Sequence, residues 1–225
     1  MGDVDETIDD VAVEPECDGG PEGCDHVSGM PERRPFVGGG DDLRDRDLCE
    51  VIESEERAWE GRIFDVDTLR VSLPDGRPAR RDVVRHPGAV ALVALTDDGR
   101  VCLVRQYRTA LDRVTVELPA GKLDPGEDPE HCAHRELLEE TGFKAEKLAL
   151  LTSIVTSCGF SDEVIHIYMA TGLTFAGSDP DADEFLNVDL VDTAEFVDAA
   201  LDGRVEDAKT VVGALALDAI SRRLG

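Results

Sequence analysis

The sequence predicts an α+β domain in which a mixed β-sheet lies between α-helices. Short strand-like runs separated by turn signals fill the middle of the chain, and helical segments lie between and after them. Composition agrees, since 41% of the 225 residues are hydrophobic, which is enough for a single core. We therefore expect one ordinary domain with some additional chain.

Turn signals separate the expected strands. Pro74-Asp75-Gly76 joins the first two, and Thr96-Asp97-Asp98-Gly99 joins the next two, which predicts two hairpins. The expected strands are residues 62–73, 77–85, 89–95, 101–107, 114–118, 148–156 and 164–170.

Three helices are expected among and after these strands. Asp128 can cap the first helix, Pro129 suits its first turn, and Gly142 can end it. Two further helices, over residues 193–201 and 207–222, finish the chain.

The first 45 residues differ in composition from the rest. They are rich in Asp, Glu, Gly and Pro and lack apolar periodicity, which predicts a disordered acidic extension. Met30 lies inside it, so translation starting there remains an alternative. Cys17, Cys24 and His26 are conceivable zinc ligands, but their spacing fits no standard zinc site, so reduced thiols are the simpler interpretation. Residues 46–225 then form the folded domain, with a strand-rich part at about 58–86 and a core at about 87–225.

The chain is strongly acidic. It carries 50 Asp and Glu against 23 Lys and Arg, a formal net charge of −27, so nucleic acids and anionic membranes would be repelled. Only four of the cations are lysines, and removing the first 30 residues still leaves −17, which favours a halophilic protein over an acidic tail on an ordinary domain. No signal peptide opens the chain, and its apolar runs are far shorter than the roughly 20 residues of a membrane span, so we expect a cytoplasmic protein.

Three glutamates on the first expected helix point to metal chemistry. Glu136, Glu139 and Glu140 are spaced i, i+3 and i+4, so they share one helix face. Like charges there oppose one another unless a cation neutralises them, and carboxylate oxygens are ligands that Mg²⁺ or Mn²⁺ prefers. For any single glutamate, a solvated acidic surface is the simpler explanation, but the whole pattern favours a metal site.

The residues around this helix resemble the Nudix box, G-x5-E-x7-R-E-U-x-E-E-x-G-U, in which U is a bulky apolar residue. Gly121 and Glu127 match its first part, and residues 135–143 match the rest, including Gly142. A chance match at a given start is on the order of one in 10⁸. The resemblance implies the Nudix fold, a mixed sheet between helices preceded by an N-terminal antiparallel strand region.

A wider resemblance, over roughly residues 59–213, is to the ADP-ribose pyrophosphatase branch of that family. It rests on residues 59–64, 85–90, 104–108, 117–121, 159–163 and 207–210. It implies Mg²⁺-dependent hydrolysis of ADP-ribose, a small nucleotide substrate, to AMP and ribose 5-phosphate. It also implies a homodimer whose N-terminal strands exchange between subunits.

The same resemblance assigns metal binding to the backbone carbonyl of Ala120 with Glu136 and Glu140. Glu139 would support or join these ligands, and Arg135 would orient the carboxylates. Gly121, Glu127 and Gly142 would shape the box.

Substrate contacts and proton transfer are assigned by resemblance as well. Arg108 would bind the diphosphate, which suits a guanidinium, and Glu117 would belong to the same substrate site. Arg80 or Arg81 would pack against adenine, and Glu163 would take the proton of the attacking water.

Alternatives remain for the substrate and for the function. Cys158 stands where the branch commonly has proline, so another nucleoside diphosphate derivative, such as a nucleotide sugar, NADH or a dinucleotide, stays open. A nucleophilic role for Cys158 is disfavoured, because no His or Lys lies beside it in the sequence. A non-catalytic ADP-ribose sensor is disfavoured by the intact glutamates.

Overall fold

The computed structural model describes residues 47–177 and 185–224. The expected acidic extension and the Cys17, Cys24 and His26 interpretation lie outside these residues. The domain limits drawn from the sequence therefore stay a prediction. None of the described helices is long and apolar enough to cross a membrane.

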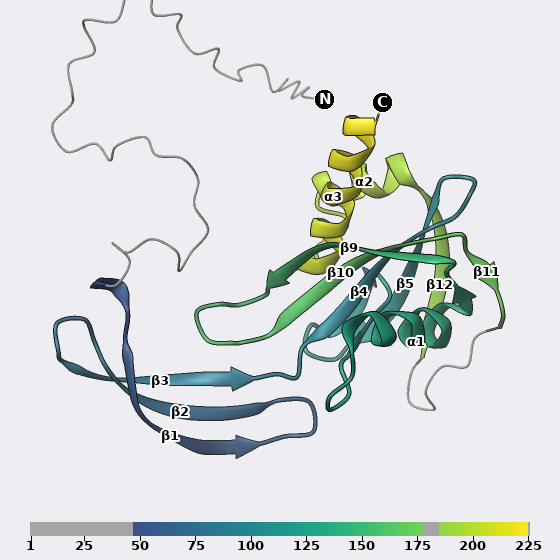
Figure 1. Ribbon diagram of the computed structural model, residues 1–225. Coiled ribbons are helices and arrows are strands. Elements are labelled where there is room, and N and C mark those ends of the chain that lie inside the picture. The colour runs from purple at the N-terminus through teal and green to yellow at the C-terminus, as the bar shows by residue number, and fades with distance from the viewer. Residues whose placement is uncertain (1–46, 178–184, 225) are drawn as a thin grey trace, which may run out of the picture. The chain divides into compact units, whose positions relative to one another are not determined.

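The elements alternate between short strands and three helices (Figure 1). The strands are β1 (Val51–Glu60), β2 (Asp65–Ser72), β3 (Pro78–Arg85), β4 (Ala89–Leu95), β5 (Arg100–Arg108), β6 (Arg113–Glu117), β7 (Ala120–Lys122), β8 (Phe143–Lys144), β9 (Lys147–Val155), β10 (Val164–Thr171), β11 (Thr174–Phe175) and β12 (Leu186–Asp192). The helices are α1 (Pro129–Thr141), α2 (Thr193–Leu201) and α3 (Ala208–Leu224).

A seven-stranded mixed sheet forms the centre of the fold. Its main order is β12-β5-β4-β10-β9, with β6 added beside β5 and β7 beside β4. Strand β10 runs parallel to β4, whereas the other described pairs in this sheet are antiparallel. The predicted mixed sheet is confirmed.

Helices cover both faces of this sheet, as Figure 1 shows for α1 on one side and α2 with α3 on the other. Side chains of β4 alternate between the two layers, as strand geometry requires. Its odd-numbered residues pack with Phe196 of α2 and Leu217 of α3, and its even-numbered residues pack with Leu137 of α1. A strand that is buried on both faces has a continuous run of apolar residues, and residues 89–95 form such a run.

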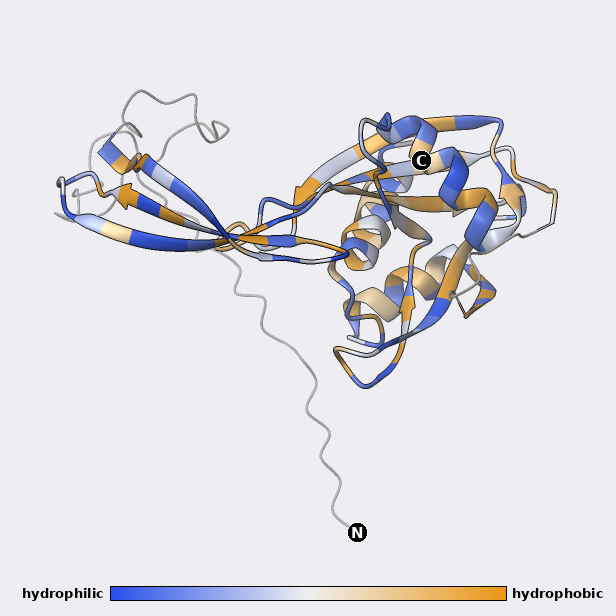
Figure 2. Ribbon diagram, turned by 90° about the horizontal axis from the view of Figure 1, so that it is seen from below, coloured by the Kyte–Doolittle hydropathy of each residue, from blue (hydrophilic) through white to orange (hydrophobic). Residues whose placement is uncertain are grey.

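The strands β1, β2 and β3 form a separate antiparallel sheet. All ten residues of β1 are exposed in the single chain, including Val51, Ile52 and Trp59, whereas β2 buries Leu69 and Val71. In Figure 2, hydrophilic residues dominate this three-stranded sheet, whereas hydrophobic stretches run along the strands of the seven-stranded sheet and along the helices that cover it.

Five strands were not expected from the sequence: β1, β7, β8, β11 and β12. Strand β1 has no buried face, so it lacks the alternation that marks a half-buried strand. Strands β7, β8 and β11 have only two or three residues and exist through pairing with distant strands. The first expected strand also begins later, at Asp65, because residues 61–64 bend and bring the rings of Trp59 and Phe64 to 5.4 Å.

Candidate active site

Helix α1 begins and ends as its local sequence predicts. Asp128 accepts hydrogen bonds from the backbone N–H groups of Glu130 (3.0 Å) and His131 (3.3 Å), and Pro129 occupies the first turn. Gly142 ends the helix with φ of 74°, a left-handed conformation that glycine adopts without strain. These caps fix where α1 begins and ends.

Glu136 and Glu140 lie on the inner side of α1, against strand β7. Their residues are 8% and 4% exposed. Glu140 Oε2 accepts a hydrogen bond from the backbone N–H of Ala120 at 2.9 Å. A Cβ atom at Gly121 would lie 1.9 Å from Cδ of Glu136, so the missing side chain makes room for this carboxylate. The structure therefore brings Ala120, Gly121 and the two glutamates together.

Arg135 connects the glutamates of the motif. Its guanidinium donates to both carboxylate oxygens of Glu127 (3.0 and 2.9 Å), to Glu136 (2.6 Å) and to Glu139 (3.0 Å). It also donates to the backbone carbonyl of Lys122 at 3.1 Å. Hydrogen bonds from Arg135 hold the pKa of Glu127 well below its ordinary value. Arg135 therefore fixes the loop after β7 to the helix.

The carboxylates of α1 suit a hard divalent cation by their chemistry. Across residues 47–177 and 185–224, no three His, Cys, Asp or Glu side chains already converge as a ready-made metal site. The three glutamates do not converge because each has another partner. Arg135 donates to Glu136 and Glu139, and the backbone N–H of Ala120 donates to Glu140. Two nearly buried carboxylates, those of Glu136 and Glu140, nevertheless offer only oxygen donors, which fits Mg²⁺ or Mn²⁺.

Arg108 and Glu117 belong to a second charged cluster, at the ends of β5 and β6. Arg108 donates two hydrogen bonds of 2.7 Å each to Glu117, which also accepts from Thr115 (2.6 Å) and from Lys209. Burial opposes the charged form of Glu117, but the hydrogen bond from Arg108 and the charge of Lys209 outweigh it, so its pKa is about 2.

A cavity of about 540 Å³ opens beside this cluster. Its lining combines both signs of charge with apolar side chains: Arg108, Ala110, Leu111, Arg113, Val114, Thr115, Val116, Glu117, Arg204, Glu206, Asp207 and Lys209. Sequence reasoning missed Lys209 as part of the site. Residues 207–210 are among those on which the family resemblance rests, and this match could have indicated Lys209.

Glu163 lies at the end of the loop between β9 and β10. Its Oε2 atom accepts from Thr156 Oγ1 at 2.6 Å, and its Oε1 atom lies 3.5 Å from Nδ1 of His86. These described partners are not the α1 glutamates. Strand pairing still connects the Glu163 loop to the strand beside the α1 glutamates. Ala89 of β4 pairs with Ile165 of β10 on one side and with Lys122 of β7 on the other. His86 was not expected from the sequence.

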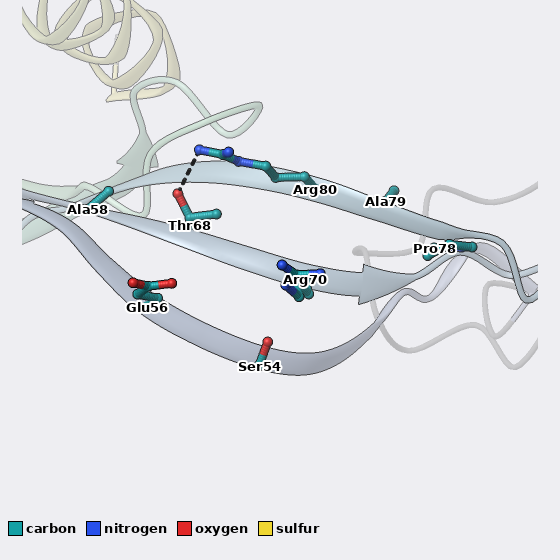
Figure 3. A pocket seen from close by; sticks show the side chains of 8 residues that line it. All are labelled: Ser54, Glu56, Ala58, Thr68, Arg70, Pro78, Ala79 and Arg80. Atoms are coloured by element: carbon teal, nitrogen blue, oxygen red, sulfur yellow. Dashed lines mark hydrogen bonds between the residues drawn. The ribbon is translucent and has the colours of Figure 1, made fainter.

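Arg80 and Arg81 lie elsewhere, on the three-stranded sheet. Arg80 donates to Thr68 at 3.0 Å and pairs with Asp82, and it lines a hollow of about 510 Å³ on this sheet (Figure 3). Arg81 pairs with Glu50. The structure of one chain thus does not bring these arginines to the α1 glutamates.

The chain matches a protein-family model and is similar in sequence to several known proteins. Residues 84–212 match the model of the NUDIX domain. The chain is 41% identical over 167 residues to the ADP-ribose pyrophosphatase of Bacillus subtilis, covering 73% of this chain and 90% of that protein. It is 44% identical over 159 residues to the methanol dehydrogenase activator of Bacillus methanolicus, covering 70% and 86%.

A solved structure shares the fold. A crystal structure of an ADP compounds hydrolase superposes with a TM-score of 0.68 at 24% identity, covering 78% of this chain and 96% of that one. The family model alone spans more than half of the chain, and it includes the box on α1. The chain therefore belongs to the NUDIX family.

Proposed function

We propose that the protein hydrolyses the diphosphate bond of ADP-ribose to AMP and ribose 5-phosphate with Mg²⁺, or alternatively Mn²⁺. The observation that carries this is the pair of nearly buried carboxylates, Glu136 and Glu140, placed beside β7. A relative named ADP-ribose pyrophosphatase, 41% identical, supports the substrate.

Glu136 and Glu140, with the backbone carbonyl of Ala120, would hold the cation, and Glu139 would support them. When bound, the cation would offset the negative charge of the diphosphate and make the attacking water more acidic. Arg135 keeps the carboxylates oriented through its bonds to Glu127, Glu136 and Glu139.

Glu163 is the proposed general base. It would accept a proton from the attacking water as the water oxygen bonds to phosphorus and the bond from phosphorus to the bridging oxygen breaks. Strand β10, which begins directly after Glu163, and strand β7 flank β4, so at a strand spacing of about 4.8 Å these two strands lie about 10 Å apart. The diphosphate and the attacking water would lie between Glu163 and the α1 glutamates.

Arg108 is the proposed diphosphate contact, since a guanidinium binds phosphate oxygens through paired hydrogen bonds. Glu117 and Lys209 would hold Arg108 at the cavity that they line together. Arg80 or Arg81 would reach adenine from the partner subunit.

A homodimer is part of the proposal. Strand β1 exposes both faces in the single chain, including Trp59, and these apolar side chains suit a surface covered by a second copy. The acidic charge favours a small-molecule substrate over nucleic acid. The cytoplasm remains the expected compartment.

Substrate profiling tests the proposal. Phosphate-ester products would be measured from ADP-ribose, a nucleotide sugar, NADH and a dinucleotide, each with and without Mg²⁺. We expect ADP-ribose to have the highest kcat/KM and all turnover to need the cation. Preference for another compound would change the substrate and keep the reaction class. No turnover of any compound, together with measurable binding of ADP-ribose, would instead support a sensor.

A further inference from the structure

The loop that carries Glu163 is attached to the end of β3 through its backbone. Phe160 accepts a hydrogen bond from the N–H of Val84 at 2.7 Å, and Asp162 donates its own N–H to the carbonyl of Val84 at 3.2 Å. Val84 thereby forms a parallel bridge with Ser161. Backbone hydrogen bonds thus join the loop between β9 and β10 to strand β3 of the three-stranded sheet.

Asp162, which directly precedes Glu163, also binds this strand through its side chain. Its Oδ1 atom accepts from the backbone N–H of His86 at 2.9 Å, and its Oδ2 atom accepts from Nη1 of Arg85 at 3.2 Å. One carboxylate therefore spans two successive residues at the end of β3.

Arg85 is itself fixed from the opposite side. Its Nε atom donates to Asp67 of β2 at 3.0 Å, and its Nη2 atom donates to Glu55 of β1 at 2.7 Å. The Asp67 side chain is 5% exposed and also pairs with Arg57. A planar guanidinium that bonds three carboxylates in three directions has little freedom to rotate.

We propose that Arg85 is a positioning residue for the hydrolysis, holding Asp162 and thereby the loop that aims Glu163. The proposal rests on the proposed function, since the aim of Glu163 matters only if Glu163 takes the proton. A general base must lie within hydrogen-bond reach of the proton that it removes, and a displacement of about 1 Å can cost about 10²-fold in rate. Arg85 thus connects Glu55 of β1 and Asp67 of β2 to the loop that carries Glu163.

Arg57 offers a matched control. Arg57→Gln and Arg85→Gln each remove one of the two cations that pair with Asp67, but only Arg85 bonds to Asp162. We expect Arg85→Gln to lower kcat by about 10- to 100-fold with KM for ADP-ribose changed less than about threefold. Arg57→Gln should lower the melting temperature by a similar amount and keep kcat near the wild-type value. Equal loss of kcat in both variants would overturn the proposal.

Asp162→Asn provides a second variant that is expected to fold, because this side chain is 42% exposed. It keeps an oxygen for the N–H of His86 and weakens only the bond from Arg85. A fall in kcat like that of Arg85→Gln, with little change in melting temperature, is expected. Wild-type kcat in Asp162→Asn would contradict the role of this contact.

A double-mutant cycle separates this proposal from the function on which it rests. If Arg85 acts through Glu163, Arg85→Gln should lower kcat little further in a Glu163→Gln background. An equal loss in both backgrounds would overturn the role of Arg85 alone. Near-normal kcat in Glu163→Gln by itself would instead remove the proposed base, and the positioning role with it.

Discussion

Arg108 and Glu117 are joined by two parallel hydrogen bonds of 2.7 Å at the ends of neighbouring strands. The Glu117 side chain is 4% exposed, and it also accepts from Thr115 and Lys209. These donors outweigh the cost of burial and keep the pKa of Glu117 at about 2. The carboxylate therefore stays charged near neutral pH and holds Arg108 at the rim of the cavity.

This pair makes stability depend on pH in a defined window. The pKa of Glu117 is lower in the folded chain than in the unfolded chain, so its charged form stabilises the fold above the unfolded pKa of 4.5. This stabilisation is lost as the pH falls toward the folded pKa of about 2. Glu117→Gln should lower the free energy of unfolding by up to about 3 kcal/mol at pH 7. Urea unfolding at a series of pH values should show this difference closing between about pH 4.5 and 2. A difference that stays constant with pH would contradict the assignment.

Glu140→Gln should weaken Mg²⁺ binding. Glutamine keeps an oxygen for the N–H of Ala120, so the fold should be retained while the negative charge is lost. We expect Mg²⁺ affinity, measured by calorimetry, to fall by about tenfold or more, with activity partly restored at high Mg²⁺. Glu130→Gln, an exposed acid in the first turn of the same helix, is the matched control and should leave both unchanged. Equal effects of the two substitutions would show only a general loss of negative charge.

Helix α1 could be predicted from the sequence because its determinants are local. The Asp128 cap, Pro129 and Gly142 act within one turn of the helix, and the spacing of Glu136, Glu139 and Glu140 fixes their shared face. The continuous apolar run of β4 is also local. Both therefore appear in the structure where they were expected.

Other parts of the site depend on contacts that no local pattern encodes. Lys209 meets Glu117 from 92 positions away, and Arg85 meets Asp162 from 77. Strand β1 has no buried face of its own, so periodicity gives no signal for it. Long-range pairing of this kind follows from the topology of the sheets.

Residues 1–45 should be dispensable for catalysis. Every residue assigned to metal, substrate or proton transfer lies later in the chain, the earliest being Arg80. A chain beginning near Asp45 should therefore keep the kcat and Mg²⁺ affinity of the full protein, measured side by side with ADP-ribose. Loss of bound zinc or of activity on truncation would revive the interpretation of Cys17, Cys24 and His26 as ligands.

Salt should stabilise the protein strongly. The formal net charge is −27, and −17 remains without the first 30 residues, so self-repulsion opposes the compact state at low ionic strength. Molar KCl shortens the Debye length to about 3 Å and should raise the melting temperature by several degrees. Calorimetry of the full chain and of the truncated chain would compare the two charges directly. A melting temperature that does not change with KCl would remove the halophilic interpretation.

Glu163→Gln should separate proton transfer from binding. The amide keeps an oxygen that can accept from Thr156 Oγ1, so the loop should stay in place, but it cannot take a proton from water at neutral pH. We expect kcat to fall by about 10²–10⁴-fold, the usual contribution of a general base, while the affinities for Mg²⁺ and ADP-ribose stay near wild type. Single-turnover kinetics would confirm that the chemical step is slowed. Near-normal kcat would make Glu163 only a loop acid and would direct the search for the base to Glu139.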